Sequence, residues 1–133
     1  MVLRKLRAAL LVTAIATVAV ASLGGPAQAT SYNGKCESGE VCLYWGGAYY
    51  GGVADFYNDI WNYKSFVFKG PSPGAGHPLN DNSRSAKNKA RWSKAVLCVD
   101  SNFGGKCMEM DPGDAYPDLG PFNNELSSHF FFG

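Results

Sequence analysis

The chain has 133 residues, enough for one domain, and its 12 basic side chains nearly balance its 11 acidic ones. A chain with a formal net charge of only +1 has no electrostatic reason to bind nucleic acid or an anionic membrane, so neither is expected as a partner. No segment after residue 30 is apolar enough to cross a bilayer.

The first 29 residues have the pattern of a secretory signal peptide. Three basic residues precede an apolar stretch at 8–23, and Ala27-Gln28-Ala29 fits the small subsites of a signal peptidase. The sixteen residues of that stretch fall short of the roughly 20 that a membrane-spanning helix needs. We therefore expect cleavage after Ala29 and a secreted, extracellular domain of residues 30–133, with nine basic and eleven acidic side chains.

Four cysteines lie in the part expected to be exported: Cys36, Cys42, Cys98 and Cys107. An even number in an oxidising compartment predicts two disulfides, although the sequence alone allows three pairings. We favour Cys36–Cys42 and Cys98–Cys107 because each pair flanks a short turn-forming segment. The alternative is a metal site, but no histidine lies near either pair at the spacing of zinc ligands.

Helix signals are nearly absent after residue 30. Gly, Pro, Asn, Asp and Ser interrupt the chain every few residues, and the runs between them are short and aromatic or β-branched. Many short strands at close spacing are typical of a β-sandwich or a small barrel. The predicted strands are 41–45, 65–69, 95–99, 106–111 and 128–132.

An internal repeat divides this part of the chain into two halves. Residues 43–51 align without gaps on 97–105, and residues 81–86 align on 123–128. The offsets are 54 and 42, so the first half is longer by twelve residues, part of which the Pro/Gly-rich stretch 70–78 accounts for. We expect two half-domains, about 36–88 and about 91–132, packed about a pseudo-twofold axis.

The repeat resembles the hairpin pattern of microbial βγ-crystallin-like proteins: an aromatic, four residues, an aromatic, one residue and Gly. The two copies are Tyr44…Tyr49-x-Gly51 and Cys98…Phe103-x-Gly105, in which Cys98 replaces the first aromatic. The glycine supplies a backbone conformation closed to other residues. In that superfamily a serine from the later loop pins each hairpin, and Ser85 and Ser127 match. The resemblance implies an all-β, βγ-crystallin-like sandwich of two Greek-key motifs with short disulfide loops.

Within that superfamily the chain is similar to secreted actinomycete peptidase inhibitors of the metalloproteinase-inhibitor type. Their mature domain begins with Cys, five residues with a central Gly, Cys, and a short strand carrying Tyr, and residues 36–44 have this form. The resemblance implies an inhibitor that blocks the cleft of an extracellular metalloprotease with an exposed loop. The matching reactive bond is Cys98–Val99, unless both are core strand residues, and 70–78 and 57–63 are alternative contact loops.

Calcium binding is the second hypothesis. Crystallin-type sites take Asx-Asx-x-x-Ser/Thr-Ser from each half, and the oxygen atoms of such residues suit Ca²⁺. The candidate ligands are Asp81, Asn82, Ser85, Asn123, Asn124 and Ser127. The alternative is that these Asn and Asp side chains only close turns. If calcium is the function, the protein is a structural or stress protein without a protease target. No other cofactor is expected.

An enzyme is not expected. All four cysteines should be oxidised, so no Cys/His nucleophile can be assembled. His77 lies in a Gly/Pro loop, and His129 lies in an aromatic strand, where a structural role is expected. Turn chemistry explains the acidic residues at 111, 114 and 118 better than paired acid/base catalysis does. We expect a monomer.

Overall fold

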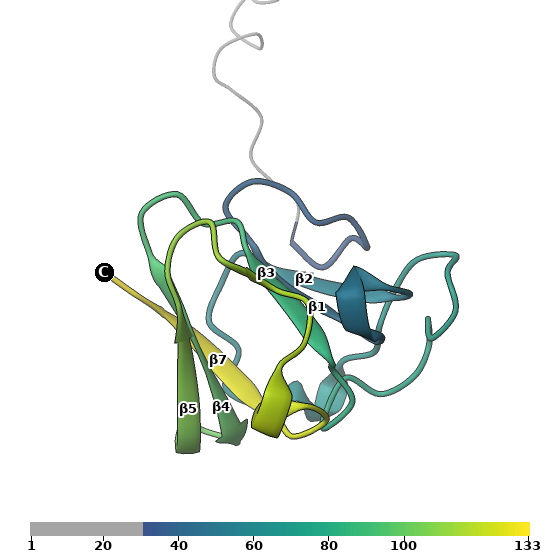
Figure 1. Cartoon of the computed structure of the whole chain (residues 1–133). Coiled ribbons are helices and arrows are strands. Elements are labelled where there is room, and N and C mark those ends of the chain that lie inside the picture. The colour runs from purple at the N-terminus through teal and green to yellow at the C-terminus, as the bar shows by residue number, and fades with distance from the viewer. Residues whose placement is uncertain (1–30) are drawn as a thin grey trace, which may run out of the picture.

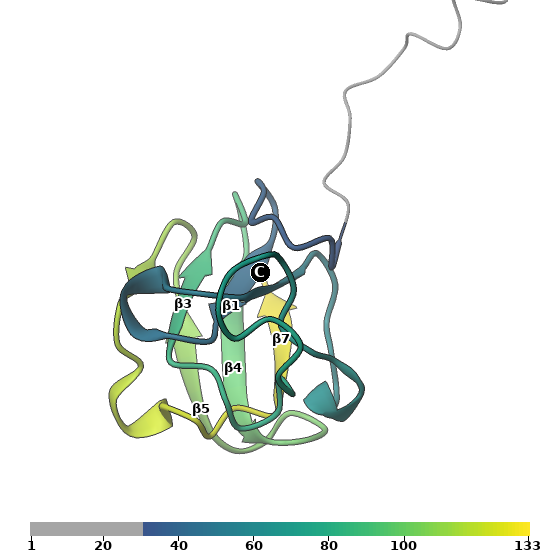
Figure 2. The same ribbon diagram turned by 90° about the vertical axis from the view of Figure 1, so that its right-hand side faces the viewer.

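The computed structural model describes residues 31–133, so the predicted signal peptide lies outside the described residues. Within them, seven strands form two antiparallel sheets (Figures 1 and 2). The first sheet has the order β2 (Val53–Phe56), β1 (Val41–Tyr44), β3 (Ser85–Asn88) and β6 (Ala115–Tyr116). The second has the order β5 (Gly104–Met110), β4 (Lys94–Asp100) and β7 (Ser128–Phe132). Three short 3₁₀ helices, η1 (Gly47–Tyr49), η2 (Tyr63–Ser65) and η3 (Gly120–Phe122), lie in the connections.

The hydrophobic core lies between the two sheets, which confirms the all-β sandwich expected from the sequence. Leu43 of β1, Leu97 of β4 and Met110 of β5 are all fully buried in one cluster. All four residues of β1 are buried, because Cys42 and Tyr44 on its other face form a second cluster against which Cys36 and Tyr49 pack. The strand β1, which lies between β2 and β3, is therefore buried on both faces.

Each half contributes an extended segment to the sheet of the other half. The strand β6 comes from the second half and pairs with β3 through Ala86 and Tyr116. Ile60 comes from the first half and pairs with β7 at His129. Ala86 and His129, the residues that receive these segments, are 43 residues apart. Other equivalent positions of the two halves have the same separation, so the pseudo-twofold repeat relates the two exchanges. The exchange ties the halves together by backbone hydrogen bonds as well as by the core.

Each half also contains a folded hairpin that a serine pins, and here one prediction is wrong. Ser85 Oγ accepts the Tyr49 N–H at 2.9 Å, as expected. In the second half, however, Ser128 and not Ser127 accepts the Phe103 N–H, at 3.0 Å. The serines are therefore 43 residues apart, and the first half is longer by eleven residues rather than twelve, because the hairpins stay 54 apart.

Three further strands were not predicted, and one predicted strand does not form. The strands β2 and β3 contain polar residues that the fold buries, among them Asp55 and Asn88, which masks their pattern. The strand β6 has only two residues. Residues 65–69 make only isolated bridges, Val67 with Pro78 and Lys69 with Val53, instead of a regular strand.

Candidate functional site

The Cys98–Val99 peptide bond lies within the central strand of the second sheet. β4 pairs with β5 on one side and with β7 on the other. Cys98 is fully buried, and its carbonyl accepts the Ser127 N–H at 2.8 Å. A protease can reach this bond only if β4 separates from its neighbours, because a scissile carbonyl must enter the oxyanion site of the enzyme. The reactive-bond assignment stays a prediction that carries this structural cost.

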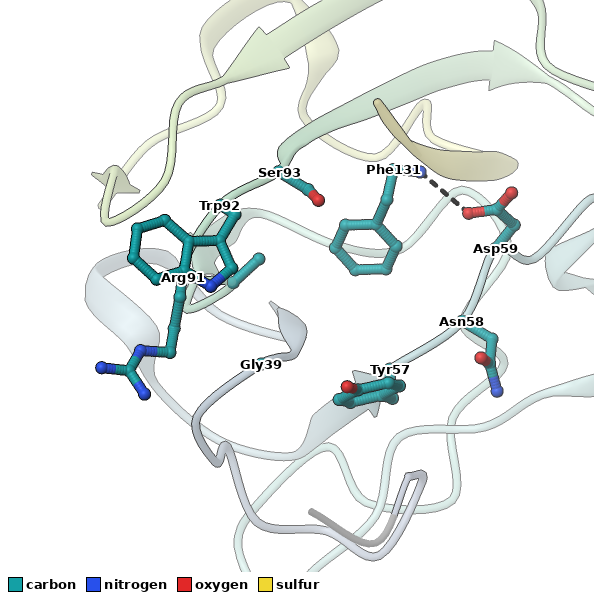
Figure 3. Close-up of a pocket in the computed structure, with 9 residues that line it drawn as sticks. Gly39, Tyr57, Asn58, Asp59, Arg91, Trp92, Ser93 and Phe131 are labelled. Atoms are coloured by element: carbon teal, nitrogen blue, oxygen red, sulfur yellow. Dashed lines mark hydrogen bonds between the residues drawn. The ribbon is translucent and has the colours of Figure 1, made fainter. Parts of the chain in front are cut away.

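Residues 57–62 are instead exposed or half-buried at the edge of β7, and the segment 57–63, whose last residue is fully buried, is anchored to that strand. Ile60 exchanges two backbone hydrogen bonds with His129, of 3.0 and 2.9 Å. The Asp59 carboxylate accepts the Phe131 N–H at 2.8 Å (Figure 3). The Tyr63 N–H donates to the Ser127 carbonyl at 2.9 Å. The loop is therefore fixed along its length rather than only at its ends.

His129 fixes the same loop from inside the protein. Its Nε2 lies 2.9 Å from the Asn58 carbonyl and must donate there, so its Nδ1 accepts the Tyr63 hydroxyl at 2.8 Å. Burial lowers the pKa of His129 to about 4, so the imidazole is neutral at physiological pH. Burial also raises the pKa of Tyr63 well above its usual value, which keeps the hydroxyl protonated. The structural role expected for His129 is confirmed.

Trp61 is the most exposed large hydrophobic residue of this loop. It is 61% exposed although its backbone is held, since its carbonyl accepts the Asn102 N–H at 2.7 Å. Asn102 lies in the β4–β5 turn, and the next residue, Phe103, is 38% exposed and packs against Phe130. Two exposed aromatic side chains, Trp61 and Phe103, thus flank this contact on a rigid support.

The other candidate contact loop, residues 70–78, has no exposed aromatic side chain comparable to Trp61. It projects from the first half beside β2 (Figure 1), and its backbone is held where the Pro73 carbonyl accepts the Gly52 N–H at 2.9 Å and the Gly76 N–H donates to the Phe68 carbonyl at 2.7 Å. Its residues 70–76 are Gly, Pro, Ser and Ala, which offer neither a large side chain nor a charge. Interface energy concentrates in Trp, Tyr and Arg side chains. Residues 57–63 are therefore the better candidate.

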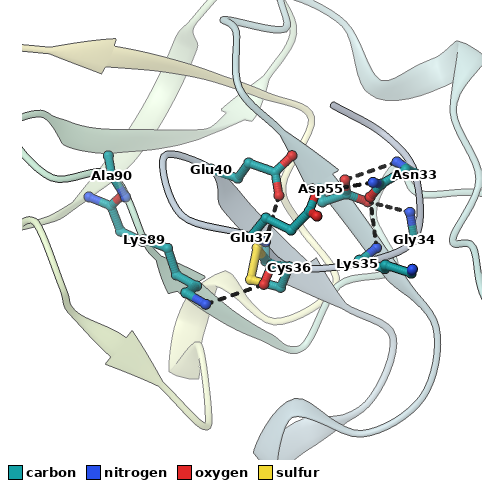
Figure 4. The surroundings of a disulfide bond; sticks show 11 residues. Asn33, Gly34, Lys35, Cys36, Glu37, Glu40, Asp55, Lys89 and Ala90 are labelled. Carbon is teal, nitrogen blue, oxygen red and sulfur yellow. Dashed lines mark hydrogen bonds between the residues drawn. A yellow bond between two sulfur atoms is a disulfide. The ribbon is translucent and has the colours of Figure 1, made fainter. Parts of the chain in front are cut away.

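The two disulfides are those favoured from the sequence, Cys36–Cys42 and Cys98–Cys107. The second joins residues directly opposite each other on β4 and β5. The first closes a loop beside two fully buried carboxylates, Glu40 and Asp55 (Figure 4).

Both buried carboxylates hold the N-terminal segment in place. Asp55 accepts the N–H groups of Asn33 and Gly34 at 2.9 and 2.8 Å, and Glu40 accepts the Glu37 N–H at 2.7 Å. Burial, together with the nearby negative charge of Asp55, raises the pKa of Glu40 to about 7. The protonated acid is thus the favoured form of Glu40 under mildly acidic conditions.

Comparison with known proteins identifies the family. The sequence profile described as peptidase inhibitor family I36 matches residues 29–110, more than half of the chain. The chain belongs to peptidase inhibitor family I36. No curated protein matches it.

The solved structures that resemble this I36 protein share its fold. One comes from work on the evolution of the eye lens βγ-crystallin domain fold, with a TM-score of 0.59, 21% identity, and coverage of 80% of this chain and 92% of that one. A βγ-crystallin from Ciona intestinalis has a TM-score of 0.54, 20% identity, and coverage of 69% and 98%. Spherulin 3a from Physarum polycephalum has a TM-score of 0.53, 22% identity, and coverage of 75% and 88%. The βγ-crystallin-like sandwich is confirmed.

In this I36 chain the two crystallin-type calcium motifs meet across the interface between the halves. The Asp81 N–H donates to the Leu126 carbonyl at 3.0 Å, and the Asn124 N–H donates to the Ser83 carbonyl at 2.9 Å. These contacts are reciprocal under an offset of 43, and Asp81 and Asn124 both have a left-handed backbone, with φ of 62° and 58°. The motifs therefore align as 80–85 on 123–128, one residue away from the alignment predicted.

The corrected alignment makes the two motifs unequal. Ser127 Oγ lies 3.2 Å from Asp81 Oδ1, and the neighbouring Asn80 Oδ1 is buried without a hydrogen-bond partner among the described residues. Oxygen atoms of three side chains therefore occur at this position, which keeps calcium binding a prediction here. At the equivalent place in the other half, Arg84 replaces Ser127, and a guanidinium does not fit a cation site.

The remaining candidate ligands have structural uses. Asn82 and Asn123 close turns, donating to the Pro78 carbonyl and to Asp118 at 2.8 Å each. Ser85 pins the first hairpin. Across residues 31–133, no group of three or more His, Cys, Asp or Glu side chains is placed to hold a metal ion. The same residues include no helix with the length and apolarity needed to cross a membrane.

Sequence reasoning included Trp61 only as a member of an alternative loop, and it did not single out Trp92, which is 81% exposed. Both are tryptophans in connections between strands rather than in strands. A large aromatic residue amid turn-forming residues was the signal that could have identified them.

Proposed function

We propose that this protein is a secreted inhibitor of an extracellular metalloprotease and that residues 57–63 block the active-site cleft. The observation that carries the proposal is the contrast within Trp61, whose carbonyl is hydrogen-bonded while its side chain is 61% exposed. A side chain of this size on a fixed backbone loses little conformational freedom on docking. Its contact energy therefore contributes to affinity almost in full.

The loop is proposed to obstruct the protease cleft rather than to bind in it as a substrate does. A substrate-like segment pairs its backbone with the enzyme and presents a free carbonyl to the catalytic centre. In this loop the carbonyls of Ile60 and Trp61 already accept hydrogen bonds from His129 and Asn102. Because these bonds hold the carbonyls away from the enzyme, we expect no cleavage at either position.

Family membership and the two disulfides support the partner and the compartment. Disulfides persist in oxidising environments, and a secreted protease is the kind of partner that an extracellular inhibitor meets. The metalloprotease class rests on the resemblance of the Cys36–Cys42 loop to inhibitors of that type.

The experiment compares the oxidised wild-type protein with two aromatic variants. Trp61→Ala should weaken inhibition roughly 30-fold, the cost of removing an interface anchor worth ~2 kcal/mol. Tyr50→Ala is the control, since it removes an exposed aromatic side chain outside the loop and should inhibit as the wild type does. Equal inhibition by wild type and Trp61→Ala would overturn the assignment of this loop.

Calcium binding is the second candidate function, at one position only. Two observations favour it: the close approach of Ser127 Oγ to Asp81, and the buried Asn80 Oδ1, which has no hydrogen-bond partner within residues 31–133. The two proposals are compatible, because this position does not involve residues 57–62.

A further inference from the structure

A groove of about 640 Å³ lies between the start of the exposed loop and the connection that joins the two halves. Tyr57, Trp92 and Phe131 surround it with three aromatic rings (Figure 3). Its volume falls within the range of about 300–1,000 Å³ that is usual for small-ligand sites. Family membership does not account for this groove, and Trp61 does not line it.

Trp92 lines the groove and is 81% exposed, while the backbone on both sides of it is held. The fully buried side chain of Asn88 braces the connection on both sides of it, accepting the Ala90 N–H at 3.0 Å and donating to the Ser93 carbonyl at 3.0 Å. A tryptophan exposed on a braced turn adds nothing to the core. Together with Tyr57 and Phe131 it lines one groove, and a contiguous exposed aromatic patch marks an interaction surface.

Tyr57 forms a second fixed platform. Its ring lies directly against Gly39, where an added Cβ would come within 2.8 Å of the ring. Gly39 has a φ of +95° and its N–H donates to the Lys89 carbonyl at 2.8 Å, so the surface under the ring is itself held. The Tyr57 N–H is held in turn by Ser31 Oγ at 3.0 Å.

Polar side chains line the groove beside the rings. The Asn58 amide, the Arg91 guanidinium and the Ser93 hydroxyl all line the groove, together with the carboxylate of Asp59. Over the described part of the chain, neither Asp59 nor Arg91 forms a salt bridge. One acid and one base leave the lining without net charge.

We propose that this groove binds a neutral oligosaccharide of hexose units. The C–H faces of sugar rings pack on flat aromatic rings, and planar amide, carboxylate and guanidinium groups hydrogen-bond pairs of hydroxyls. A peptide strand fits less well, because the Phe131 N–H at this edge of β7 is already occupied by Asp59. An anionic ligand fits less well because Arg91 is balanced by Asp59.

The test is a binding titration of the oxidised protein with chitohexaose, cellohexaose, laminarihexaose and maltohexaose, read by calorimetry and by tryptophan fluorescence. We expect saturable binding of at least one hexaose. Trp92→Ala should weaken it roughly tenfold or more. The control is Tyr50→Ala. Tyr50 follows η1, is 55% exposed and does not line the groove, so this variant should leave binding unchanged.

Two outcomes would overturn the proposal: no saturable binding of any of the four sugars at millimolar concentration, or wild-type binding by Trp92→Ala. Melting temperatures of the variants show whether each is folded. Protease inhibition is measured on the same samples, because failure of the sugar site leaves inhibition through Trp61 intact and the reverse also holds.

Discussion

Ser85 and Ser128 hold equivalent positions in the two halves of the protein. Ser85 Oγ donates to the Gly46 carbonyl at 2.6 Å while accepting the Tyr49 N–H, and Ser128 Oγ donates to the Asp100 carbonyl at 2.6 Å while accepting the Phe103 N–H. Both amides belong to residues with a left-handed backbone, with φ of 61° and 62°. A single hydroxyl thus stabilises a strained turn in each hairpin.

Replacing either pinning serine should destabilise the protein. Ser85→Ala and Ser128→Ala should each lower the free energy of unfolding by about 1–3 kcal/mol, because a carbonyl and an N–H lose their partner. The matched control is Ser127→Ala, whose hydroxyl makes only the 3.2 Å contact with Asp81 and should cost less. Urea unfolding in the absence of calcium measures all three. A larger loss for Ser127→Ala than for Ser128→Ala would contradict the corrected alignment.

The buried acid Glu40 should make stability fall as pH rises. Its pKa is about 7 when folded and 4.5 ordinarily, so between these values the folded state retains a proton that the unfolded state has lost. Stability contributed by this group is complete below pH 4.5 and declines until about pH 7. Glu40→Gln should therefore stabilise the protein above pH 7 by an amount on the order of 1–3 kcal/mol. Thermal melts across this range, with the exposed Glu125→Gln as control, test the prediction; no gain at alkaline pH would refute it.

His129 should act in the opposite direction. Burial lowers its pKa from 6.5 to about 4, so the unfolded state binds a proton that the folded state excludes between those values. Its contribution to stability is complete above pH 6.5 and is lost as the pH falls toward 4. In Glu40→Gln this dependence should become visible as a melting temperature that falls with acidification. A flat profile for that variant below pH 6.5 would show that His129 is not buried as the neutral imidazole.

Calcium should bind at one position and depend on Ser127. We expect Ca²⁺ to raise the melting temperature of the wild-type protein modestly, since a ligand that binds only the folded state stabilises it. Ser127→Ala should abolish the shift, whereas Arg84→Ser should enlarge it by restoring a hydroxyl in the other half. The shift is measured by calorimetry against Mg²⁺ as control. A shift unchanged in Ser127→Ala would place the ion elsewhere.

The repeat was the feature of the sequence that predicted the fold. Hairpins are local, so Tyr49-x-Gly51 and Phe103-x-Gly105 could be recognised without knowing what they pack against. The serine register could not be derived in this way, because two adjacent serines, Ser127 and Ser128, satisfy the same motif. The two serines are distinguished only by the folded structure, in which the Phe103 N–H lies within hydrogen-bond distance of Ser128 Oγ.

The candidate site was harder to predict because its residues meet through the exchange of segments between halves. Trp61 is fixed by Asn102, and Asn58 by His129, across 41 and 71 residues of sequence. No local pattern encodes these contacts. Cys98–Val99 carried a recognisable motif, yet its place in a central strand follows from pairing on both sides.

The central claim is that the loop at 57–63 blocks a protease cleft through Trp61. Its most direct test is a stoichiometric titration of a thermolysin-like metalloprotease, with serine proteases in parallel, by the oxidised protein and by Trp61→Ala. Mass spectrometry of the mixture shows whether the Cys98–Val99 bond is cut. We expect stoichiometric loss of metalloprotease activity with the wild type, much weaker inhibition by the variant, and an intact Cys98–Val99 bond. Unchanged inhibition by Trp61→Ala, with slow cleavage after Cys98, would contradict it.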